Sequence, residues 1–321
     1  MKAKTKVISE MKKIAFLILA HKSPEQITRL LKVLKHPQAD CYFHLDKKMQ
    51  ITEEQKAEIR LQGGVILSQR ESCYLDDWSL PKAELLLLNE SRKVCSYKYY
   101  ILLSGQDYPI KPISDLIELL EQNYPKPYID TTPYSDNNWI AHKLWTTKLH
   151  RKFKFVCNRI QSRVGRVRGL NRLQDICQRL SSKFQPSAFS QLASLNVKVY
   201  GGSQWWALPD VAVNEIMSDI QANPRIVETF KWVFTPDELF FQTMVMRTSV
   251  APLIDINPVD AREQHCLTYA NFVTPTKGFC SHPHILETED WKRLKQRPEF
   301  FARKFDMDSS PAILELIDKH L

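Results

Sequence analysis

The first 125 residues alternate between short apolar runs and longer stretches in which apolar residues recur every three or four positions. Residues 13–20, "KIAFLILA", have the length and composition of a buried strand. Residues 23–36, "SPEQITRLLKVLKH", have the period of an amphipathic helix, with Ser23 as N-cap and Pro24 in the first turn. The same pattern predicts strands at 41–46, 64–68 and 97–105 and helices at 52–61, 78–94 and 113–122. This alternation predicts an α/β fold with a mostly parallel sheet covered on both faces.

Beyond about residue 125 the alternation weakens. Residues 148–183 contain eleven Lys or Arg and a single acidic residue, Asp175, and this basic stretch predicts helices inserted at the surface. We expect strands to resume at 197–202 and 204–208, followed by helices at 209–221 and 236–246. The second half is therefore predicted to complete the sheet and to carry a basic helical insertion.

The net positive charge favours a negatively charged partner. The chain has 45 Lys and Arg against 36 Asp and Glu, a net charge of +9, and the basic stretch 148–183 can account for the whole surplus. Three interpretations of that stretch stay open: a solvated helical face, docking on an anionic membrane, and nucleic-acid binding. Nucleic acid is not expected as a partner, because no recognition motif accompanies the charge.

The cysteines and the amino-terminal segment predict a chain that folds in a reducing cytosol. The seven cysteines are widely spread and form no C-x-x-C, so they indicate neither a disulfide framework nor a zinc site. The apolar run at 14–20 has only the length of a strand, and no run approaches the roughly 18 residues that a membrane span needs. We therefore expect the first core strand there rather than a signal peptide.

Polar side chains follow three of the predicted strands. His21, Asp46 and Asp107, the last in the turn "SGQDYP", stand where ligands of parallel sheets bind, beyond the carboxyl ends of the strands. The glycine-rich dinucleotide and P-loop signatures and the G-x-S-x-G elbow do not occur. Asp306 and Asp308 could hold a divalent ion beside a diphosphate, but they precede a helix start, where acids are stabilised by the helix dipole, and we predict no metal site.

The stretch "FTPDELFFQ" at 234–242 permits two interpretations of Glu238. Thr235, Pro236 and Glu238 fit a capping box, in which the carboxylate bonds back to the helix start. The alternative is a carboxylate that accepts a proton during catalysis. The catalytic alternative is considered because the acid pair Asp237 and Glu238 follows "YGGSQWWALP", a glycine and tryptophan run suited to a binding surface.

Several stretches in order resemble one family. They are "LAHKSPEQITRLLKVL" with "YFHLDKK", then "YYILLSGQDYPIK", "YGGSQWWAL" followed by "FTPDELFFQT", and the closing "FFARKFDMDSSPAILELIDKHL". Together they resemble the Core-2/I-branching β-1,6-N-acetylglucosaminyltransferases and the related peptide xylosyltransferases, here as a bacterial member. The resemblance implies a GT-A fold and inverting transfer from a UDP-sugar without a divalent metal or other cofactor. It implies one domain over 1–321, with a nucleotide-sugar-binding half at about 12–125, an acceptor-binding and catalytic half at about 126–321, and the basic insert at about 148–185.

The resemblance also assigns roles on the donor side. It makes Glu238 the general base and places Lys304, with Arg303 beside it, on the donor diphosphate. His21 and Asp46 match positions beside the nucleotide, and Asp107 lies in the matching turn. One family arginine falls near Ser281, where this chain has none, and the residues that could replace it are Lys277, His282 and His284.

On the acceptor side the expectations rest on residue types. Trp205 and Trp206 can present flat apolar faces to a sugar, but one of two adjacent strand residues must point away, and Trp206 is slightly favoured as the one that contacts the acceptor. Asp130 can bond acceptor hydroxyls or be a structural acid at a strand end. Asp237 is also expected among the acceptor-binding residues. Its carboxylate can supply the negative charge that a helix start prefers, which leaves Glu238 available for catalysis.

The expected function is therefore a metal-independent inverting glycosyltransferase that builds a bacterial surface glycan at the inner face of the cell membrane, in the cytoplasm. Its partners would be a UDP-sugar, with N-acetylglucosamine as first choice, and a glycan or lipid-linked glycan acceptor. Xylose, galactose and glucuronic acid stay open. The rival is a basic protein that binds nucleic acid or acidic glycan without catalysis.

Overall fold

The computed structural model describes residues 12–136, 138–164, 169–258, 265–274, 278–279 and 282–321. Its largest sheet has the order β3-β2-β1-β4-β9-β6. The first four of these strands run parallel, while β9 is antiparallel to both β4 and β6. The bounds are β1 Lys12–Ala20, β2 Ala39–Leu45, β3 Val65–Ile66, β4 Tyr97–Ser104, β6 Tyr128–Ile129 and β9 Trp206–Pro209. The predicted parallel sheet is confirmed for its first half.

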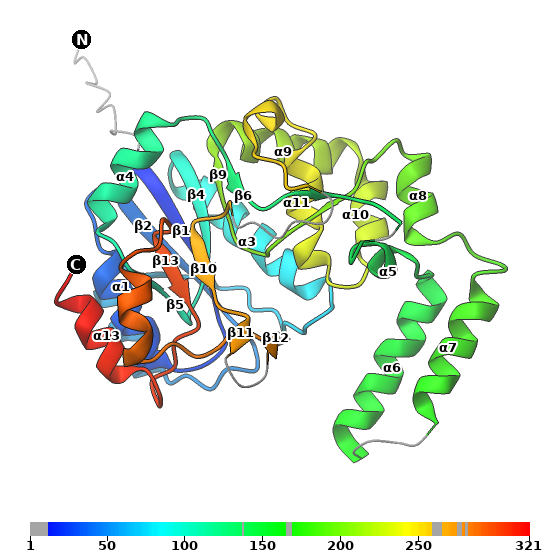
Figure 1. Cartoon of the computed structure of the whole chain (residues 1–321), viewed down its shortest axis with the longest axis horizontal. Helices are drawn as coiled ribbons and strands as arrows, with labels where there is room; N and C mark the ends of the chain where they lie inside the picture. The colour runs from blue at the N-terminus through cyan, green and yellow to red at the C-terminus, as the bar shows by residue number, and fades with distance from the viewer. Residues whose placement is uncertain (1–11, 137, 165–168, 259–264, 275–277, 280–281) are drawn as a thin grey trace, which may run out of the picture.

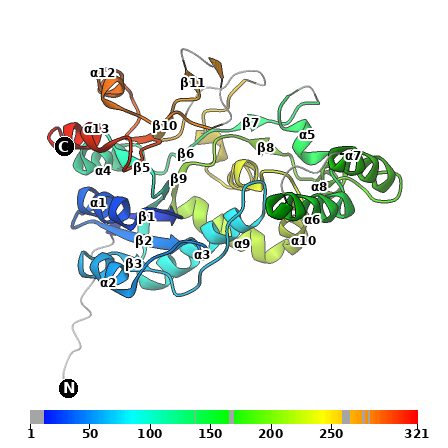
Figure 2. The ribbon, with the colours of Figure 1, turned by 90° about the horizontal axis from the view of Figure 1, so that it is seen from below.

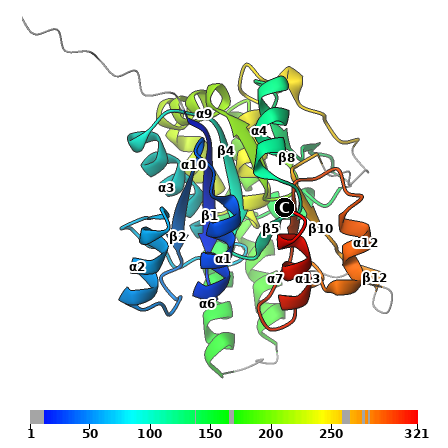
Figure 3. The ribbon, with the colours of Figure 1, turned by 90° about the vertical axis from the view of Figure 1, so that its left-hand side faces the viewer.

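A second, three-stranded sheet lies beside the first, with the order β10-β13-β5. Figures 2 and 3 show β5 and β10 on the opposite side of β1 from the helix α3, Ser79–Val94. In this sheet β13 is parallel to β10 and antiparallel to β5. Two short strand pairs, β7 with β8 and β11 with β12, complete the strands of the described residues. The bounds are β5 Asp107–Pro109, β7 Thr132–Pro133, β8 Tyr200–Gly201, β10 Thr268–Ala270, β11 Val273–Thr274, β12 Gly278–Phe279 and β13 Phe301–Arg303.

Helices cover both faces of the main sheet, as expected (Figure 1). Alternate residues of β1 enter two different core clusters, because successive side chains of a strand point to opposite faces. One cluster includes residues of α3 and α9, and the other includes residues of α1, α4 and α13. These helices span α1 Pro24–Leu34, α3 Ser79–Val94, α4 Ile113–Gln122, α9 Asp210–Ala222 and α13 Pro311–Asp318.

The predicted basic helices are present as α6, Lys148–Val164, and α7, Leu170–Ser181. They pack against each other, and Figures 1 and 3 show them projecting side by side away from the rest of the molecule. Whether they are an insertion relative to the family stays a prediction. The remaining helices and helical turns are α2 Glu53–Leu61, α5 Ala141–Leu144, α6 Lys148–Val164, α7 Leu170–Ser181, α8 Ala188–Ser194, α10 Pro224–Phe230, η1 Pro236–Glu238, α11 Phe240–Val245, η2 Ala251–Leu253, η3 Thr288–Asp290 and α12 Trp291–Leu294.

Three expectations about local structure need correction. The single helix predicted at 236–246 is two pieces, η1 and α11, because Leu239 between them has φ −128° and its side chain is buried. The strand predicted at 64–68 shrinks to β3. The strand predicted at 197–202 shrinks to β8, which pairs with β7 instead of joining the main sheet. In the part of the chain that the structure describes, no helix combines the length and apolar character needed to cross a membrane.

Candidate active site

The carboxyl ends of three strands meet at one edge of the main sheet. His21 directly follows β1, Asp46 directly follows β2, and the turn after β4 leads to Asp107. Backbone bonds join these ends, since Asp46 N donates to Ala20 O at 2.7 Å and Gly105 N donates to Leu19 O at 2.9 Å. The structure thus brings these three predicted positions to the same edge.

Asp46 organises the loop that follows β3. Its carboxylate is buried and accepts bonds from Lys48 N at 2.7 Å and from Cys73 N at 3.1 Å. Arg70 donates to the backbone oxygens of Leu45 and Asp46. Asp46 therefore holds segment 72–78 against the end of β2, and its contact with a nucleotide stays a prediction.

Asp107 orients Arg303. The pairing of β5 with β13 sets the two residues opposite each other, and Arg303 Nε lies 3.2 Å from Asp107 Oδ1. Asp107 is fully buried and also accepts bonds from Ser104 N at 2.8 Å and Ser104 Oγ at 2.7 Å. The Arg303 guanidinium lies 4.2 Å from the ring centre of Trp205. Burial raises the pKa of Asp107, and the Arg303 charge opposes that rise.

Positive groups gather next to this pair. Partial burial lowers the pKa of Lys304, and the charges of Lys22 and Arg303 lower it further. Partial burial also lowers the pKa of His21, and so do the charges of Lys22 and Lys304. The charges of Lys22 and Arg303 act on both Lys304 and His21, so these residues lie close together. We call Lys22, Arg303 and Lys304, with His21 beside them, the cationic group. Mutual repulsion in such a group is relieved by an anion.

Lys22 joins this group although it was not among the predicted site residues. It forms an ion pair with Asp306, and that hydrogen bond lowers the pKa of Asp306. The pair gives Asp306 a structural partner close to the site. Among the residues that the structure describes, no group of three or more His, Cys, Asp or Glu side chains is arranged to hold a metal ion. The sequence signal for Lys22 was its position between His21 and the cap of α1.

The residues proposed to replace the family arginine are only partly described. Ser281 and Lys277 lie outside the described residues. The segment after them runs beside Lys304, because Leu286 N donates to Lys304 O at 2.9 Å. His282 and His284 are exposed, and His284 Nε2 lies 4.0 Å from Asp290 Oδ2. A role for either histidine stays a prediction.

Glu238 does not form the capping box that its local sequence allows. Thr235 has a left-handed backbone with φ 44°, and its buried hydroxyl has no hydrogen-bond partner. The Glu238 carboxylate instead forms an ion pair with Lys143 Nζ, and its side chain is 38% exposed. That interpretation of the sequence is therefore wrong, and the carboxylate can face a second molecule.

Lys143 is a site residue that the sequence reasoning missed. It comes from the short helix α5, and its ammonium lies 4.5 Å from the ring centre of Trp139. The side chain is buried, which is rare for lysine without a partner. Lys143 therefore fixes the position of the Glu238 carboxylate. Its neighbourhood in the chain, where the periodic pattern weakens, carried no signal for this role.

Asp237 points into the protein. It is buried, and burial together with the charge of Glu238 raises the pKa of Asp237 to about 7. Glu84 on α3 is also fully buried, burial raises its pKa, and its Oε1 accepts a bond from Gln204 Nε2 at 2.9 Å. Because its pKa is raised to about 7, Asp237 carries only part of the negative charge expected at the start of η1, and its position in the interior does not favour contact with an acceptor.

Both tryptophans are buried, and their burial does not favour Trp206 over Trp205 as the acceptor contact. Trp206 is 2% exposed and packs on Phe241 with ring centres 4.9 Å apart, so it belongs to the core. Trp205 is 4% exposed and stacks on Arg303. Both rings belong to the same core cluster, and the Arg303 guanidinium lies against the ring of Trp205. Trp205 thus supports the cationic group, and an acceptor contact by either ring stays a prediction.

Asp130 behaves as a structural acid at a strand end. It is buried, and its Oδ1 accepts bonds from His265 N and from Cys266 N, the latter at 3.0 Å. Burial raises the pKa of Asp130, and these two bonds oppose the rise. The structure favours this second of the two interpretations of Asp130, while contact with acceptor hydroxyls stays untested.

The two glycines of "YGG" explain how this segment approaches the site. Gly202 N donates to Glu238 O at 2.9 Å. A Cβ on Gly202 would lie 1.9 Å from Asp130 O, and a Cβ on Gly201 would lie 2.7 Å from Leu239 Cδ2. Since real atoms never come so close, only glycine lets this segment pass between Asp130 and the Glu238 turn.

We expect Gly202→Ala to lower the free energy of unfolding by about 1 to 3 kcal/mol, because the added methyl group must push the Asp130 backbone aside. Gly105→Ala is the matched control, since its Cβ would make only ordinary contacts at 3.5 Å. Urea denaturation of both variants tests the prediction. Equal stability of the two would show that the segment has more room than the structure indicates.

Comparison with known proteins adds to this geometry. Residues 14–295 match the family model described as Branch: Core-2/I-Branching enzyme. The chain is 25% identical over 334 residues to Xylosyltransferase 2 of Pan troglodytes, across 96% of this chain and 34% of that protein. The values for Xylosyltransferase 2 of Homo sapiens are the same. The crystal structure of Core-mannan synthase A from Aspergillus fumigatus in its Mn/GDP form aligns with 86% of this chain and 82% of its own, at 9% identity and a TM-score of 0.39.

These matches differ in what they support. The structural likeness is too low to carry an argument, and the chain spans about a third of the length of the xylosyltransferases that it matches. The family match includes Glu238 and Lys143 and ends before Arg303 and Lys304. Because it extends over far more than half of the residues, the chain belongs to the Core-2/I-Branching enzyme family.

Proposed function

We propose that this protein is an inverting glycosyltransferase of the GT-A type that moves a sugar from a UDP-sugar to a hydroxyl of a glycan, without a divalent metal. Family membership and the relatives named as xylosyltransferases support glycosyl transfer as the reaction class. N-acetylglucosamine, by resemblance, and xylose, by these relatives, are the first donors to test. Galactose and glucuronic acid follow, because donor choice depends on the shape of the pocket.

The cationic group is the main observation that supports transfer without a divalent metal. Transfer breaks the bond between the sugar and the diphosphate, so negative charge builds on the departing UDP and must be met by fixed positive charge. Lys304 and Lys22 offer ammonium groups, and Arg303 is held in place by Asp107 and Trp205. Charge-assisted bonds from such groups to phosphate oxygens are stronger than neutral ones.

Glu238 is the proposed general base. A sugar hydroxyl is a poor nucleophile, and a carboxylate within hydrogen-bond reach of it takes the proton as the new bond forms. The pair with Lys143 holds the carboxylate in place while part of it remains exposed. In the inverting reaction the hydroxyl attacks from the side opposite the leaving UDP, so Glu238 would lie across the sugar from the cationic group.

Incubation with individual UDP-sugars in excess EDTA tests the function. We expect one donor among UDP-N-acetylglucosamine, UDP-xylose, UDP-galactose and UDP-glucuronic acid to be hydrolysed to UDP and the free sugar, with water in place of the acceptor, and UDP alone to raise the melting temperature. Consumption of none of them and no shift with UDP, together with steeply salt-dependent binding of polyanions, would favour the noncatalytic binding protein instead.

A further inference from the structure

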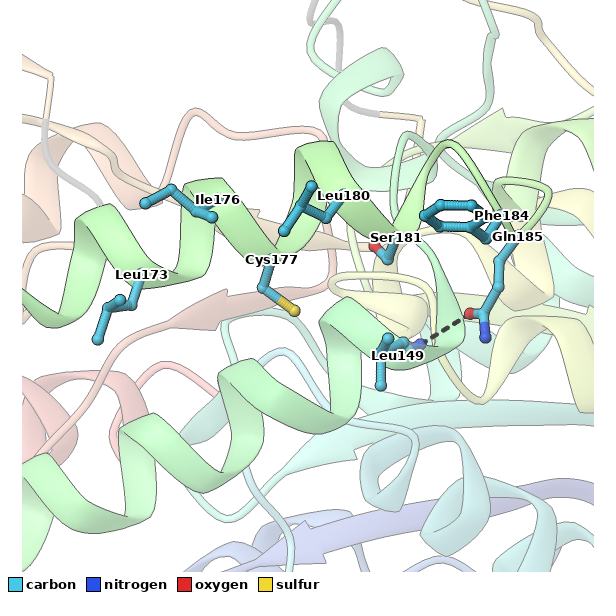
Figure 4. A pocket seen from close by; sticks show the side chains of 8 residues that line it. All are labelled: Leu149, Leu173, Ile176, Cys177, Leu180, Ser181, Phe184 and Gln185. Atoms are coloured by element: carbon cyan, nitrogen blue, oxygen red, sulfur yellow. Dashed lines mark hydrogen bonds between the residues drawn. The ribbon is translucent and has the colours of Figure 1, made fainter.

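The helical hairpin of α6 and α7 carries an apolar surface that the proposed reaction does not use. A hollow of about 330 Å³ lies along it, and Figure 4 shows side chains of α7 with Leu149 of α6 below them. The lining residues are Leu149, Leu173, Ile176, Cys177, Leu180, Ser181, Phe184 and Gln185. Nearly all of this lining is apolar, so the hollow offers little to a polar ligand.

The apolar side chains form two stripes. On α7, Leu173, Ile176 and Leu180 recur every three or four residues, which places them on one face of the helix. On α6, Leu149, Val156 and Ile160 recur at seven and four residues and likewise share one face. With Phe184 beyond the end of α7, these seven side chains are between 43% and 84% exposed. We call these seven residues the hairpin face.

Exposed positive charge accompanies the hairpin face. The described side chains of residues 148–157, 160–161 and 172–183 include five exposed Lys or Arg against one exposed acid, Asp175. Those five are Lys148, Lys152, Arg172, Arg179 and Lys183. A soluble protein rarely leaves an apolar patch of this kind open unless something covers it.

We propose that the hairpin face binds an anionic lipid bilayer, with its apolar side chains in the boundary between headgroups and acyl chains and its basic side chains on the phosphates. A bilayer would contact both the apolar and the basic side chains, because the free energies of apolar burial and of attraction to anionic lipid add in interfacial helices. A second copy of this chain fits less well, since a symmetric contact sets the same basic residues against each other. Duplex nucleic acid would leave the apolar stripes uncovered.

The base of the hairpin is tied to the candidate active site. Phe155 of α6 meets the ring of Tyr74 edge-on at 6.5 Å, and Arg151 Nη2 lies 3.9 Å from Asp77 Oδ2. Both partners belong to segment 72–78, which Asp46 holds through Cys73 N. Docking of the hairpin face would therefore set the site at a defined place above the bilayer. Given the proposed function, this arrangement suits a membrane-bound glycan acceptor.

Flotation of the full chain with lipid vesicles tests the proposal. We expect binding to phosphatidylcholine vesicles that contain about a third phosphatidylglycerol and little binding to pure phosphatidylcholine. Ile176→Gln with Leu180→Gln should weaken partitioning about tenfold or more, because two apolar side chains no longer enter the bilayer. Leu61→Gln with Leu253→Gln is the matched control, since both residues are exposed leucines on other elements, and it should bind like the wild type.

A charge variant gives independent evidence. Arg172→Gln with Arg179→Gln should weaken binding to the anionic vesicles by about ten- to thirtyfold and leave the melting temperature unchanged. Unchanged binding by both hairpin variants, or equal binding to neutral and anionic vesicles, would overturn the proposal. Light scattering that shows a dimer of the wild type, dissociated only by the Ile176 and Leu180 variant, would also overturn it. Salt-dependent binding of duplex DNA without vesicle binding would do the same. A shift of melting temperature with UDP that persists in the variants separates this proposal from the proposed function.

Discussion

Glu238→Gln is expected to lower kcat about 10²- to 10⁴-fold and to leave the Kd for UDP nearly unchanged. The amide removes the proton acceptor, yet its oxygen can still accept the bond from Lys143, so the local structure should persist. The Glu238 carboxylate lies on the turn next to Gly202 and is not part of the cationic group. The affinity for UDP should therefore stay the same. Initial rates of transfer and calorimetric titration with UDP measure the two quantities.

Glu228→Gln is the matched control for that variant. Glu228 also forms an ion pair with a lysine, Lys231, but it lies exposed on α10. We expect wild-type kcat from it. If the Glu238 variant transfers sugar at the wild-type rate, Glu238 is not the base, and an equal loss in the control variant would point to an effect of folding rather than of chemistry.

Lys304→Gln is expected to weaken UDP binding about 10- to 100-fold, because a charge-assisted bond to the diphosphate is lost. Binding of uridine, which lacks the diphosphate, should stay the same. Lys304 lies against the charges of Lys22 and Arg303, so removing its charge also removes repulsion, and the melting temperature should not fall. Calorimetric titration with both ligands checks the prediction.

Lys319→Gln controls for the loss of one positive charge near the carboxyl terminus, because Lys319 is exposed at the end of α13. Its affinity for UDP should equal that of the wild type. Equal affinities of the Lys304 variant and the wild type would remove Lys304 from the donor site. A lower melting temperature in the Lys304 variant would instead assign it a structural role.

Local periodicity predicted the first half of the fold well. The apolar run at 13–20 and the helical period after Ser23 became β1 and α1, with the Ser23 hydroxyl accepting a bond from Gln26 N at 3.3 Å. His21 and Asp46 could be placed at one sheet edge because parallel strands must end on the same side. These inferences needed only neighbouring residues and the rules of one sheet.

The predictions that failed concern contacts between residues far apart in the chain. Thr235 and Glu238 fit a capping box in sequence, but the turn adopts a left-handed backbone at Thr235 and the carboxylate pairs with Lys143 from another element. No local pattern indicates which of two adjacent tryptophans meets Arg303, because that depends on how β13 is set beside β5. Residues far apart in the chain build this site, so its geometry became visible only in the fold.

In the proposed reaction, fixed amino and guanidinium groups do for the diphosphate what a divalent metal does in other transferases. Calorimetric titration of the wild-type protein with UDP and with uridine in excess EDTA measures what these groups contribute without a metal. We expect UDP to bind at least about tenfold tighter than uridine under these conditions and added Mn²⁺ to change the ratio little. Equal affinities in EDTA, with tighter UDP binding only after Mn²⁺ is added, would contradict it.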